Sequence, residues 1–572
     1  MTGGEFLLRT IRDQGLTHVF LVPGGHIDPL VAELGKGVGL QPIVAAHEQG
    51  AGFMADGYAR VSGRFGACLG IGGPGAANLL PAAVAARSDR ARVLFITGDV
   101  PTTLQGRGAF QDGSLDGTCD AEFLRQTTVY SEEVELASQF PRQLGAAFRA
   151  MFGVPPGPAH LSVPTDLQNA PLTAEPDVLA ARWEPARPVD AGALTAVAER
   201  VLAGANRLAV LAGRGCVTSG AGEALRAFAE AFEVPVATTF AAKGVLPDDH
   251  RLALGIFGYA GTHRAISALL ADALDVLLVV GSSLNVRDTL YWSRELGGRR
   301  QVVQIDIDPT MLGRDYPVQH RVIGDCGEAL RLLRGFAEGP LRGLAATAAG
   351  RRPWTAALKA LPPFYDAENL RSAAAPVHPA RLVGELRRAL PRETILFVDS
   401  GAHRAFAGHY WESYVPGGVR SATNLGPMGW AIAAAIGGKL ARPAVPVAVL
   451  TGDGCMRMHG IEIATTARHR VPVIFVVSNN SALGNVYLRA RKANPGAAEM
   501  TILPTVDWAA FARVLGAGGR RVESPDALAP ALQEALASGG PFVLDVLTQR
   551  DCSTPVGPYN AMAAEYEHGH PA

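Results

Sequence analysis

The sequence has little cysteine, almost no net charge and no long apolar run. Its 572 residues include six cysteines, without a CxxC pair, and its formal net charge is −1. Scattered cysteines without a secretory leader predict reduced thiols rather than a disulfide framework. The charge balance gives no electrostatic reason to bind nucleic acid or an anionic membrane.

The apolar runs have the length of β-strands. The richest, residues 471–477, is far shorter than the roughly 20 apolar residues that span a bilayer. The N-terminal segment MTGGEFLLRTIRDQG has the pattern of an amphipathic helix that ends at Gly15, not that of a signal peptide. We therefore expect a soluble, cytoplasmic protein that binds neither nucleic acid nor membranes.

Short apolar runs alternate with helical patterns through three blocks of the chain. Such alternation predicts parallel sheets with helices on both faces. We therefore expect an α/β protein of three doubly wound parallel-sheet domains, at residues 1–168, 190–336 and 375–550, with a linker at 168–189. The expected strands are 18–22, 42–46, 67–71 and 93–97 in the first block, 208–211, 234–237, 276–280 and 301–307 in the second, and 394–398, 445–451, 473–478 and 542–546 in the third.

The most informative segment lies in the third block. A strand leads into Gly452, Asp453 and Gly454, and the next strand ends at Asn479 and Asn480 after 24 intervening residues. Glycines at the end of a strand let backbone amides approach an anion, and the following helix N-terminus adds its dipole. A carboxylate and an amide oxygen are ligands that suit Mg²⁺. The strand–helix–strand unit can return the second ligand beside the first.

This pattern resembles the diphosphate-binding motif of the thiamine-diphosphate-dependent enzymes, in which GDG is followed about two dozen residues later by NN. The resemblance implies that Asp453, Asn480 and the carbonyl oxygen of Ala482 bind Mg²⁺, while the GDG glycines lie at the diphosphate. Cys455 stands where a serine is common in that family, so a phosphate contact there is expected from its backbone N–H. An isolated Asp-Gly pair would instead indicate a turn.

A second signature is Glu48, which opens a helix whose first turn holds Gly50, Ala51 and Gly52. Acidic residues favour helix N-termini on electrostatic grounds alone. The segment also resembles the catalytic-glutamate motif of the same family. The resemblance implies that Glu48 hydrogen-bonds N1′ of the cofactor's aminopyrimidine and assists its activation. In that family the two signatures meet across subunits, which implies a homodimer or a dimer of dimers with sites at the interface.

Three further segments resemble parts of the same cofactor site. In GPMG, the carbonyl of Gly426 would accept from the aminopyrimidine and Met428 would support the bent cofactor, although a methionine also commonly fills a core. Ala402 and His403, just after a strand, would lie nearest the phosphates. Asn78 stands in another family motif close to the cofactor.

Two positions bear on the reaction. His26 follows the first strand in GGHID, which resembles benzaldehyde lyase, and Gln111 lies in the loop after the fourth strand. Residues 41–100 and 420–485 resemble acetohydroxyacid synthases, which share the glutamine. The loop 105–117 lacks the His-His pair of simple 2-keto acid decarboxylases. The resemblance therefore implies a carboligase that decarboxylates a pyruvate-like 2-keto acid and transfers the acyl unit to a second carbonyl, with His26 and Gln111 handling protons.

Two alternatives remain open at this stage. The first is a lyase that cleaves 2-hydroxy ketones, and the second is a catalytically silent regulatory subunit, which the presence of Glu48, Asp453 and Asn480 disfavours. FAD is a further option for the central block, but its glycines lack GxGxxG spacing and do not favour it. Trp430 and the region of Trp411 would either shape the acceptor pocket or pack in the interior.

Overall fold

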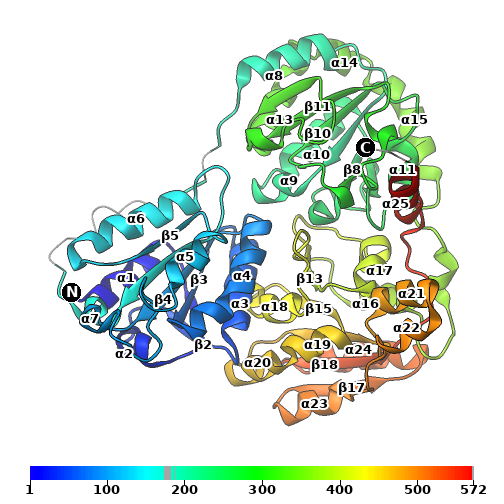
Figure 1. The fold of residues 1–572 in the computed structure, drawn as a ribbon. Coiled ribbons are helices and arrows are strands. Elements are labelled where there is room, and N and C mark those ends of the chain that lie inside the picture. The colour runs from blue at the N-terminus through cyan, green and yellow to red at the C-terminus, as the bar shows by residue number, and fades with distance from the viewer. Residues whose placement is uncertain (173–181, 186, 570–572) are drawn as a thin grey trace.

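The computed structural model describes residues 1–172, 182–185 and 187–569. The chain forms three separate sheets of six strands each, flanked by helices. All strand pairs in these sheets are parallel. In Figure 1 the first domain is blue to cyan, the central domain green, and the third yellow to orange. The predicted α/β class with three parallel-sheet domains is confirmed.

The first and third sheets share the strand order two-one-three-four-six-five, counted from the start of each domain. In this order the carboxyl ends of the first and third strands border the switch point where α/β sheets bind ligands. The strands of the first sheet are β1 (His18–Leu21), β2 (Gln41–Val44), β3 (Gly66–Ile71), β4 (Val93–Asp99), β5 (Tyr130–Glu133) and β6 (Ala159–Pro164). Those of the third are β13 (Ile395–Val398), β14 (Val419–Arg420), β15 (Val447–Gly452), β16 (Ile474–Asn479), β17 (Gly518–Val522) and β18 (Phe542–Leu547).

The central sheet has the order three-two-one-four-five-six. This is the order of dinucleotide-binding folds, and its switch point lies between the first and fourth strands. The strands are β7 (Leu208–Ala212), β8 (Val236–Thr238), β9 (Ala253–Ile256), β10 (Val276–Val280), β11 (Gln301–Asp306) and β12 (His320–Ile323).

Six strands were not expected from the apolar pattern, and five of them are edge strands: β5, β9, β12, β14 and β17. An edge strand is covered on fewer sides and needs fewer apolar residues. β5 reads YSEE and β17 reads GGRRV, for example. The sixth, β6, is fully buried but carries a histidine and a serine among its apolar residues.

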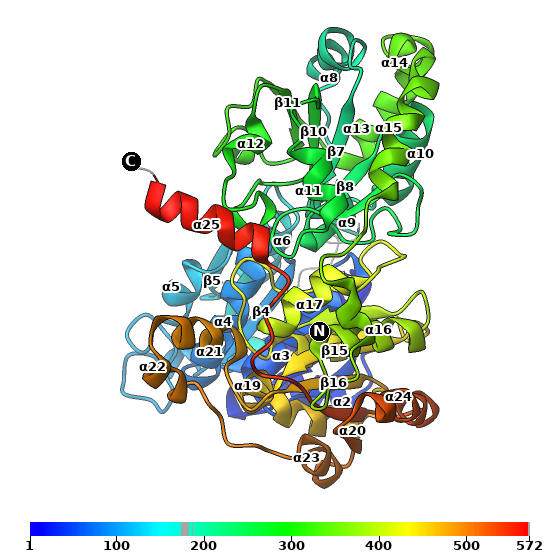
Figure 2. The ribbon, with the colours of Figure 1, turned by 90° about the vertical axis from the view of Figure 1, so that its right-hand side faces the viewer.

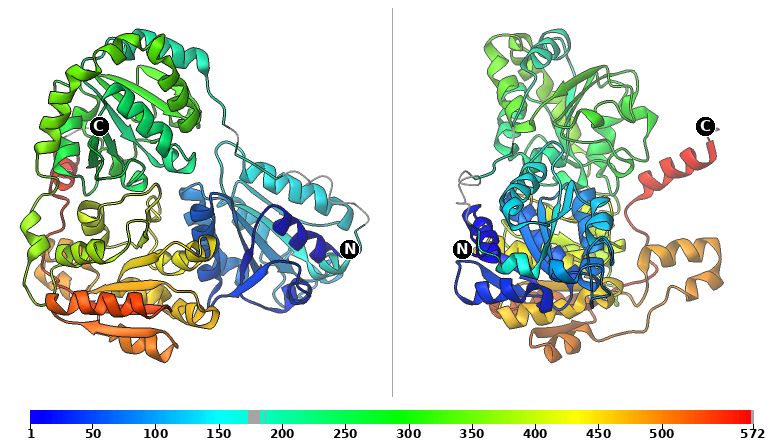
Figure 3. Two further views of the ribbon diagram at one scale, coloured as in Figure 1. Left: turned by 180° about the vertical axis from the view of Figure 1, so that it is seen from behind. Right: turned by 60° about the vertical axis from the view of Figure 1, so that its left-hand side comes forward.

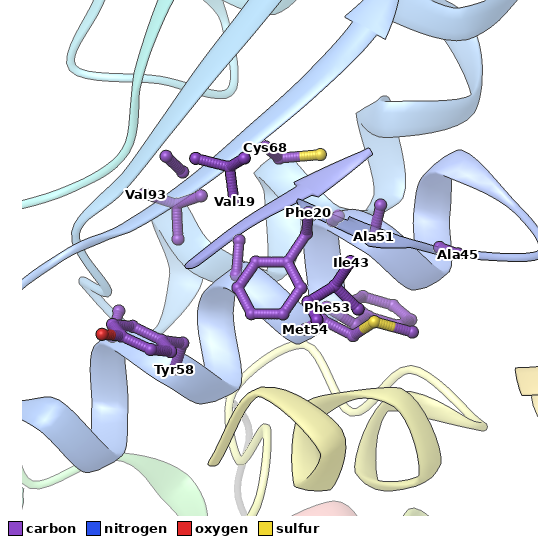
Figure 4. Packing of buried hydrophobic residues seen from close by; sticks show 14 of the residues in the cluster. Val19, Phe20, Ile43, Ala45, Ala51, Phe53, Met54, Tyr58, Cys68 and Val93 are labelled. Carbon is purple, nitrogen blue, oxygen red and sulfur yellow. The ribbon is translucent and has the colours of Figure 1, made fainter. Parts of the chain in front are cut away.

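Helix α3 (Glu48–Ser62) connects β2 to β3 and lies between the first sheet and helix α18 (Trp430–Ala441) of the third domain. Phe53 and Met54 of this helix pack beneath Phe20 of β1, and a helix of the third domain lies below them in Figure 4. One buried cluster therefore continues from the first sheet through α3 into the third domain.

The contact between α3 and α18 depends on a glycine in each helix. A Cβ on Gly57 would lie 1.9 Å from the carbonyl oxygen of Ala434, and a Cβ on Gly437 would lie 1.8 Å from the carbonyl oxygen of Met54. α18 connects β14 to β15 just as α3 connects β2 to β3. The two domains of one chain thus meet through topologically equivalent helices.

A buried carboxylate, Asp89, joins all three domains at the end of α4 (Pro74–Ser88). Its oxygens lie 2.9 Å from Arg60 Nη1 in the first domain and 2.8 Å from Arg214 Nη1 in the central domain. The N–H of Thr423 in the third domain donates to it at 3.0 Å. Burial opposes the charge, but Arg214 and Arg60 hold the pKa of Asp89 at about 2. Asp89 is therefore ionised at neutral pH.

Helical segments continue beyond the sheets. Past residue 336, α14 (Arg342–Ala346) and α15 (Ala348–Ala360) follow the central domain and contribute leucines to its buried clusters. The C-terminal helix α25 (Gly557–Gly569) lies beside the central domain, where the ring centres of Tyr559 and Tyr259 are 5.3 Å apart (Figure 2).

The N-terminus lies on the outer side of the first domain, away from the third (Figure 3). Residues 173–181 and 186 of the expected linker fall outside the described residues. Within the described ranges, no helix is both long and apolar enough to cross a membrane.

Candidate active site

The carboxyl ends of β13, β15 and β16 meet at one edge of the third sheet. Ala402 and His403 begin the helix after β13, and a Cβ on Gly452 would lie 3.1 Å from the His403 ring. A Cβ on Gly484 would lie 3.2 Å from both Ala402 Cβ and Asn480 Nδ2. The sequence-predicted diphosphate residues are thus brought together, and their small side chains expose backbone N–H groups to an anion.

Asp453 opens α19 (Asp453–His459) and is 3% exposed. Its Oδ2 atom is buried and has no hydrogen-bond partner among the described residues. Burial raises the pKa of Asp453 to about 6, against backbone N–H groups that include those of Gly454 and Asn480. Asn480 Oδ1 accepts from the N–H of Ala482 at 3.1 Å. A buried carboxylate oxygen without a partner in the described part of the chain, with Asn480 beside it, fits a cation that prefers oxygen ligands.

Met428 reaches the same edge from the loop that precedes α18. A Cβ on Gly454 would lie 3.0 Å from Met428 Cε, and the methionine is only partly buried. Gly426 and Gly429 flank it with φ values of 69° and 85°. This left-handed backbone favours glycine, so the GPMG sequence is required by the shape of the loop.

Asp399 is a position that the sequence analysis missed. Its carboxylate accepts from the N–H of Ser400 at 2.9 Å, from the N–H of Gly429 at 2.9 Å and from Thr451 Oγ1 at 3.0 Å. Asp399 therefore ties the ends of β13 and β15 to the Met428 loop. Burial raises its pKa to about 6. Its place directly after an expected strand, in VDSG, was the available signal.

Cys455 and His403 are both buried at this edge. Cys455 Sγ donates to the carbonyl oxygen of Ser400 at 3.2 Å, and burial raises the pKa of the thiol well above its ordinary value. The thiol is therefore bonded within the protein, while the backbone N–H groups in the first turn of α19 have no partner inside the helix. Burial lowers the pKa of His403 to about 3, so its ring is neutral at neutral pH.

Glu48 lies at the N-terminus of α3 in the first domain. Asn78 Nδ2 donates to Glu48 Oε2 at 3.0 Å, so the structure brings these two predicted residues together. The preceding residue, His47, caps the helix by accepting from the N–H of Gln49 at 3.0 Å. The N–H of His47 donates to Glu462 Oε1 at 3.1 Å. Glu462, a fully buried residue of the third domain that the sequence analysis missed, therefore fixes the backbone ahead of Glu48.

His26 and Gln111 lie on the carboxyl edge of the first sheet. His26 Nδ1 is buried without a hydrogen-bond partner in the described part of the chain. Burial lowers the pKa of His26, and attraction to Asp112 opposes this shift. Gln111 has a left-handed φ of 60°, and a Cβ on Gly73 would lie 3.5 Å from its Cα. The turns after β1, β3 and β4 thus converge at this edge.

Trp430 and Trp411 are packed in the interior, with 1% and 0% exposure. Trp430 Nε1 donates to Asp56 Oδ2 at 2.7 Å, at the contact between the first and third domains. The guanidinium of Arg387 lies 4.3 Å from the centre of the Trp411 ring. The structure therefore supports packing for both rings, and the acceptor-pocket interpretation is wrong for them.

A cavity of about 610 Å³ adjoins the edge of the third sheet. Asn480, Thr505, Gln549 and Arg550 are among its lining residues. Arg550 Nε donates to the carbonyl oxygen of Asn480 at 2.9 Å. The volume suits a small organic molecule. Arg550 follows the last strand and was not expected at the site.

Comparison with known proteins identifies the family. Residues 1–118 match the thiamine pyrophosphate enzyme N-terminal TPP binding domain, residues 195–333 match the central domain, and residues 399–546 match the C-terminal TPP binding domain. The chain belongs to the thiamine pyrophosphate enzyme family. It is a thiamine-diphosphate-dependent enzyme of the acetolactate-synthase-like class, as the motifs predicted.

Several relatives of this thiamine-diphosphate enzyme match over nearly the whole chain. A "probable acetolactate synthase large subunit" of Methanocaldococcus jannaschii is 30% identical over 98% of this chain and 94% of its own length. The acetolactate synthase large subunit of Corynebacterium glutamicum is 30% identical over 96% of this chain and 87% of its own. A "probable 2-ketoarginine decarboxylase AruI" of Pseudomonas aeruginosa is 32% identical over 96% of this chain and 94% of its own length.

The turns after β7 and β10 approach each other closely at the switch point of the central domain. A Cβ on Gly213 would lie 2.3 Å from the carbonyl oxygen of Gly281, so the turns after β7 and β10 abut. Arg214, next in the chain, is paired with Asp89 of the first domain. These groups border the crevice where a dinucleotide lies in folds with this strand order.

Proposed function

We propose that this enzyme uses thiamine diphosphate and Mg²⁺ to decarboxylate a pyruvate-like 2-keto acid and to transfer the acyl unit to a second carbonyl compound. The observation that carries the proposal is the Glu48–Asn78 pair at the start of α3. Support comes from relatives named as acetolactate synthase large subunits.

Each group of residues has its own task in this proposal. The cofactor, when bound, supplies the carbon nucleophile that attacks the keto-acid carbonyl. Glu48, oriented by Asn78, would hold a proton at the aminopyrimidine N1′. The cation would be held by oxygens of Asp453, Asn480 and Ala482. The diphosphate and the pyrimidine would lie against Ala402, His403, Gly426, Met428, Gly452, Gly454 and the backbone of Cys455.

His26 and Gln111 would move protons to and from the alkoxides that form on the substrates. The lowered pKa of His26 keeps its ring neutral near pH 7, so it can accept a proton there. Gln111 cannot ionise and would orient a hydroxyl by hydrogen bonding. The loop 105–117 provides no histidine to protonate the acyl unit, which favours ligation over release of an aldehyde.

The complete site would form between two copies of the chain. Within the described residues, the Glu48 side chain is bonded in the first domain, whereas Met428 and Asp453 lie against residues of the third. Phe110 and Leu115, on either side of Gln111, are 82% and 76% exposed. Large exposed apolar side chains beside a site indicate a surface that another chain covers. A dimer or a dimer of dimers would cover this loop.

The test is product analysis of the purified protein with thiamine diphosphate, Mg²⁺ and pyruvate. We expect CO₂ and acetolactate or a mixed acyloin by mass spectrometry. Glu48→Gln, which retains a partner for Asn78 but not the carboxylate, should abolish both products. Aldehyde as the sole product would overturn the ligation step. Cleavage of an added 2-hydroxy ketone without keto-acid turnover would favour the lyase alternative, and silence with both substrates despite bound cofactor would favour the regulatory one.

A further inference from the structure

Asp99, the last residue of β4, is fully buried behind the loop that carries Gln111. Its Oδ1 accepts from the N–H of Gly113 at 2.8 Å and from the N–H of Val100 at 2.7 Å. Gly113 follows Gln111 by two residues, so the first bond fixes the loop directly beside the glutamine. Asp99 Oδ2 is buried and unpartnered within the described ranges.

A second buried carboxyl group, Asp120, approaches the same point from α5 (Asp120–Arg125). Its Oδ2 accepts from the N–H of Gly73 at 2.8 Å, and its own N–H donates to the carbonyl oxygen of Gly113 at 3.0 Å. A Cβ on Gly113 would lie 2.6 Å from Asp120 Oδ2 and 3.2 Å from Asp99 Oδ1. The two carboxyl groups therefore hold one glycine between them.

The end of β4 also supports His26. A Cβ on Gly98, the residue before Asp99, would lie 1.8 Å from the carbonyl oxygen of His26. Gln168 Nε2 donates to that carbonyl at 2.8 Å. The backbone of His26 thus rests on one side of the strand end, and the Gln111 loop is bonded to the other.

We propose that Asp99, with Asp120 opposite it, is the positioning residue that fixes the Gln111 loop for the ligation step, at the end of β4 where Gly98 carries the backbone of His26. The inference rests on the proposed function, because that function places Gln111 and His26 at the substrate. Asp99 is buried behind the loop and would touch neither substrate nor cofactor. It acts through the backbone of Gly113.

The protonation state of Asp99 gives this role a pH dependence. Burial raises the pKa of Asp99 to about 7, against hydrogen bonds that favour the charged form. Below pH 7 the group is neutral, and above pH 7 it carries a charge that burial disfavours. The loop should therefore loosen as the pH rises. The charged or titratable groups that act on Asp99 are Glu133 and Asp120.

Two variants separate positioning from general destabilisation. Asp99→Ala removes both acceptors, whereas Asp99→Asn keeps an acceptor oxygen and cannot ionise. The matched control is Asp306→Ala, because Asp306 is a buried carboxyl at the end of β11 that accepts from the N–H of Asp308 at 2.9 Å. The readouts are hydrogen exchange of residues 105–119 and the pH profile of kcat for ligation.

We expect Asp99→Ala to speed exchange in residues 105–119 by about tenfold and to lower kcat by about tenfold with little change in KM. We expect the kcat of the wild-type protein to decline above pH 7, where the loop loosens. Asp99→Asn should show the wild-type rate of hydrogen exchange in this loop, and its kcat should not decline above pH 7. Asp306→Ala should leave exchange in this loop unchanged.

Unchanged loop exchange in folded Asp99→Ala overturns the proposal, and so does an equal effect of Asp306→Ala. Where Asp99→Ala fails to fold, the Asp99→Asn profile decides, and an alkaline decline like that of the wild type overturns the proposal. A wild-type protein without keto-acid turnover would refute the proposed function, while the exchange comparison would still test the positioning role.

Discussion

The first and third domains share one strand order, yet their carboxyl edges differ in kind. The edge beyond β13 and β15 carries buried glycines and a buried carboxylate oxygen of Asp453 that has no hydrogen-bond partner among the described residues. The corresponding edge of the first sheet is filled by side chains, with His26 and the Gln111 loop held against Asp99. One edge suits an anion with its cation, and the other suits proton transfer. The strand order locates a site, whereas the residues after each strand decide its chemistry.

The largest expected effect tests whether one active site combines the carboxyl edge of the first sheet in one copy of the chain with the carboxyl edge of the third sheet in a second copy. Glu48→Ala and Asp453→Ala should each lower ligation activity by at least about 100-fold. Mixed dimers purified after co-expression of both variants should show about half of wild-type activity, since each mixed dimer has one intact site and one site that carries both substitutions. Activity is measured on tandem-purified mixed dimers, with each variant alone as the control. Absence of recovery would mean that both edges act within one chain.

A second prediction concerns the carboxylate that joins the two similar domains to the central one. Asp89→Asn removes the charge that pairs with Arg60 and Arg214. Because Arg60 keeps its pair with Asp56 at 2.7 Å and Arg214 is 26% exposed, the loss should be about 1.5–3 kcal/mol in the free energy of unfolding. Because the pKa of Asp89 is lowered to about 2, its stabilisation is present above about pH 4 and is lost as the pH falls through 2.

Urea unfolding at pH 7 and at pH 3 measures this contribution. Glu534→Gln is the control, because its pair with Arg520 is exposed and should contribute less than about 1 kcal/mol. Equal losses in the two variants at pH 7 would show that Asp89 does not join the domains.

A smaller effect tests whether α3 and α18 contribute equally to the contact between the first and third domains. Gly57→Ala and Gly437→Ala each place a Cβ within 2 Å of a carbonyl oxygen of the facing helix. Each should cost about 1–3 kcal/mol by overpacking, measured by denaturant unfolding. Gly350→Ala is the control, since a Cβ there meets nothing within 4 Å. A large difference between the first two variants would contradict the equivalence.

The smallest expected effect concerns the central domain. We expect purified protein to show no flavin absorbance and added FAD to leave the melting temperature unchanged, because the glycines after β7 lack GxGxxG spacing. The control is thiamine diphosphate with Mg²⁺, which should raise the melting temperature. A yellow protein would refute the prediction.

The sequence predicted every interior strand except β6, because a strand buried on both faces reads as a continuous apolar run. It also located the GDG and NN segments, since they follow two strands that are neighbours in the chain and in the sheet. Edge strands such as β5 and β17 were missed because their polar residues carry no periodic signal.

The sequence by itself determined the α/β class, the family and the positions after each strand where chemistry is expected. Only the tertiary structure decided what holds those positions in place. Glu462 bonds to the backbone ahead of Glu48 across 415 residues, and Trp430 donates to Asp56 across 374. Asp99 and Asp120 both lie beside Gly113 in the folded loop. Local patterns report strands and turns, whereas hydrogen bonds between distant segments depend on how the domains pack.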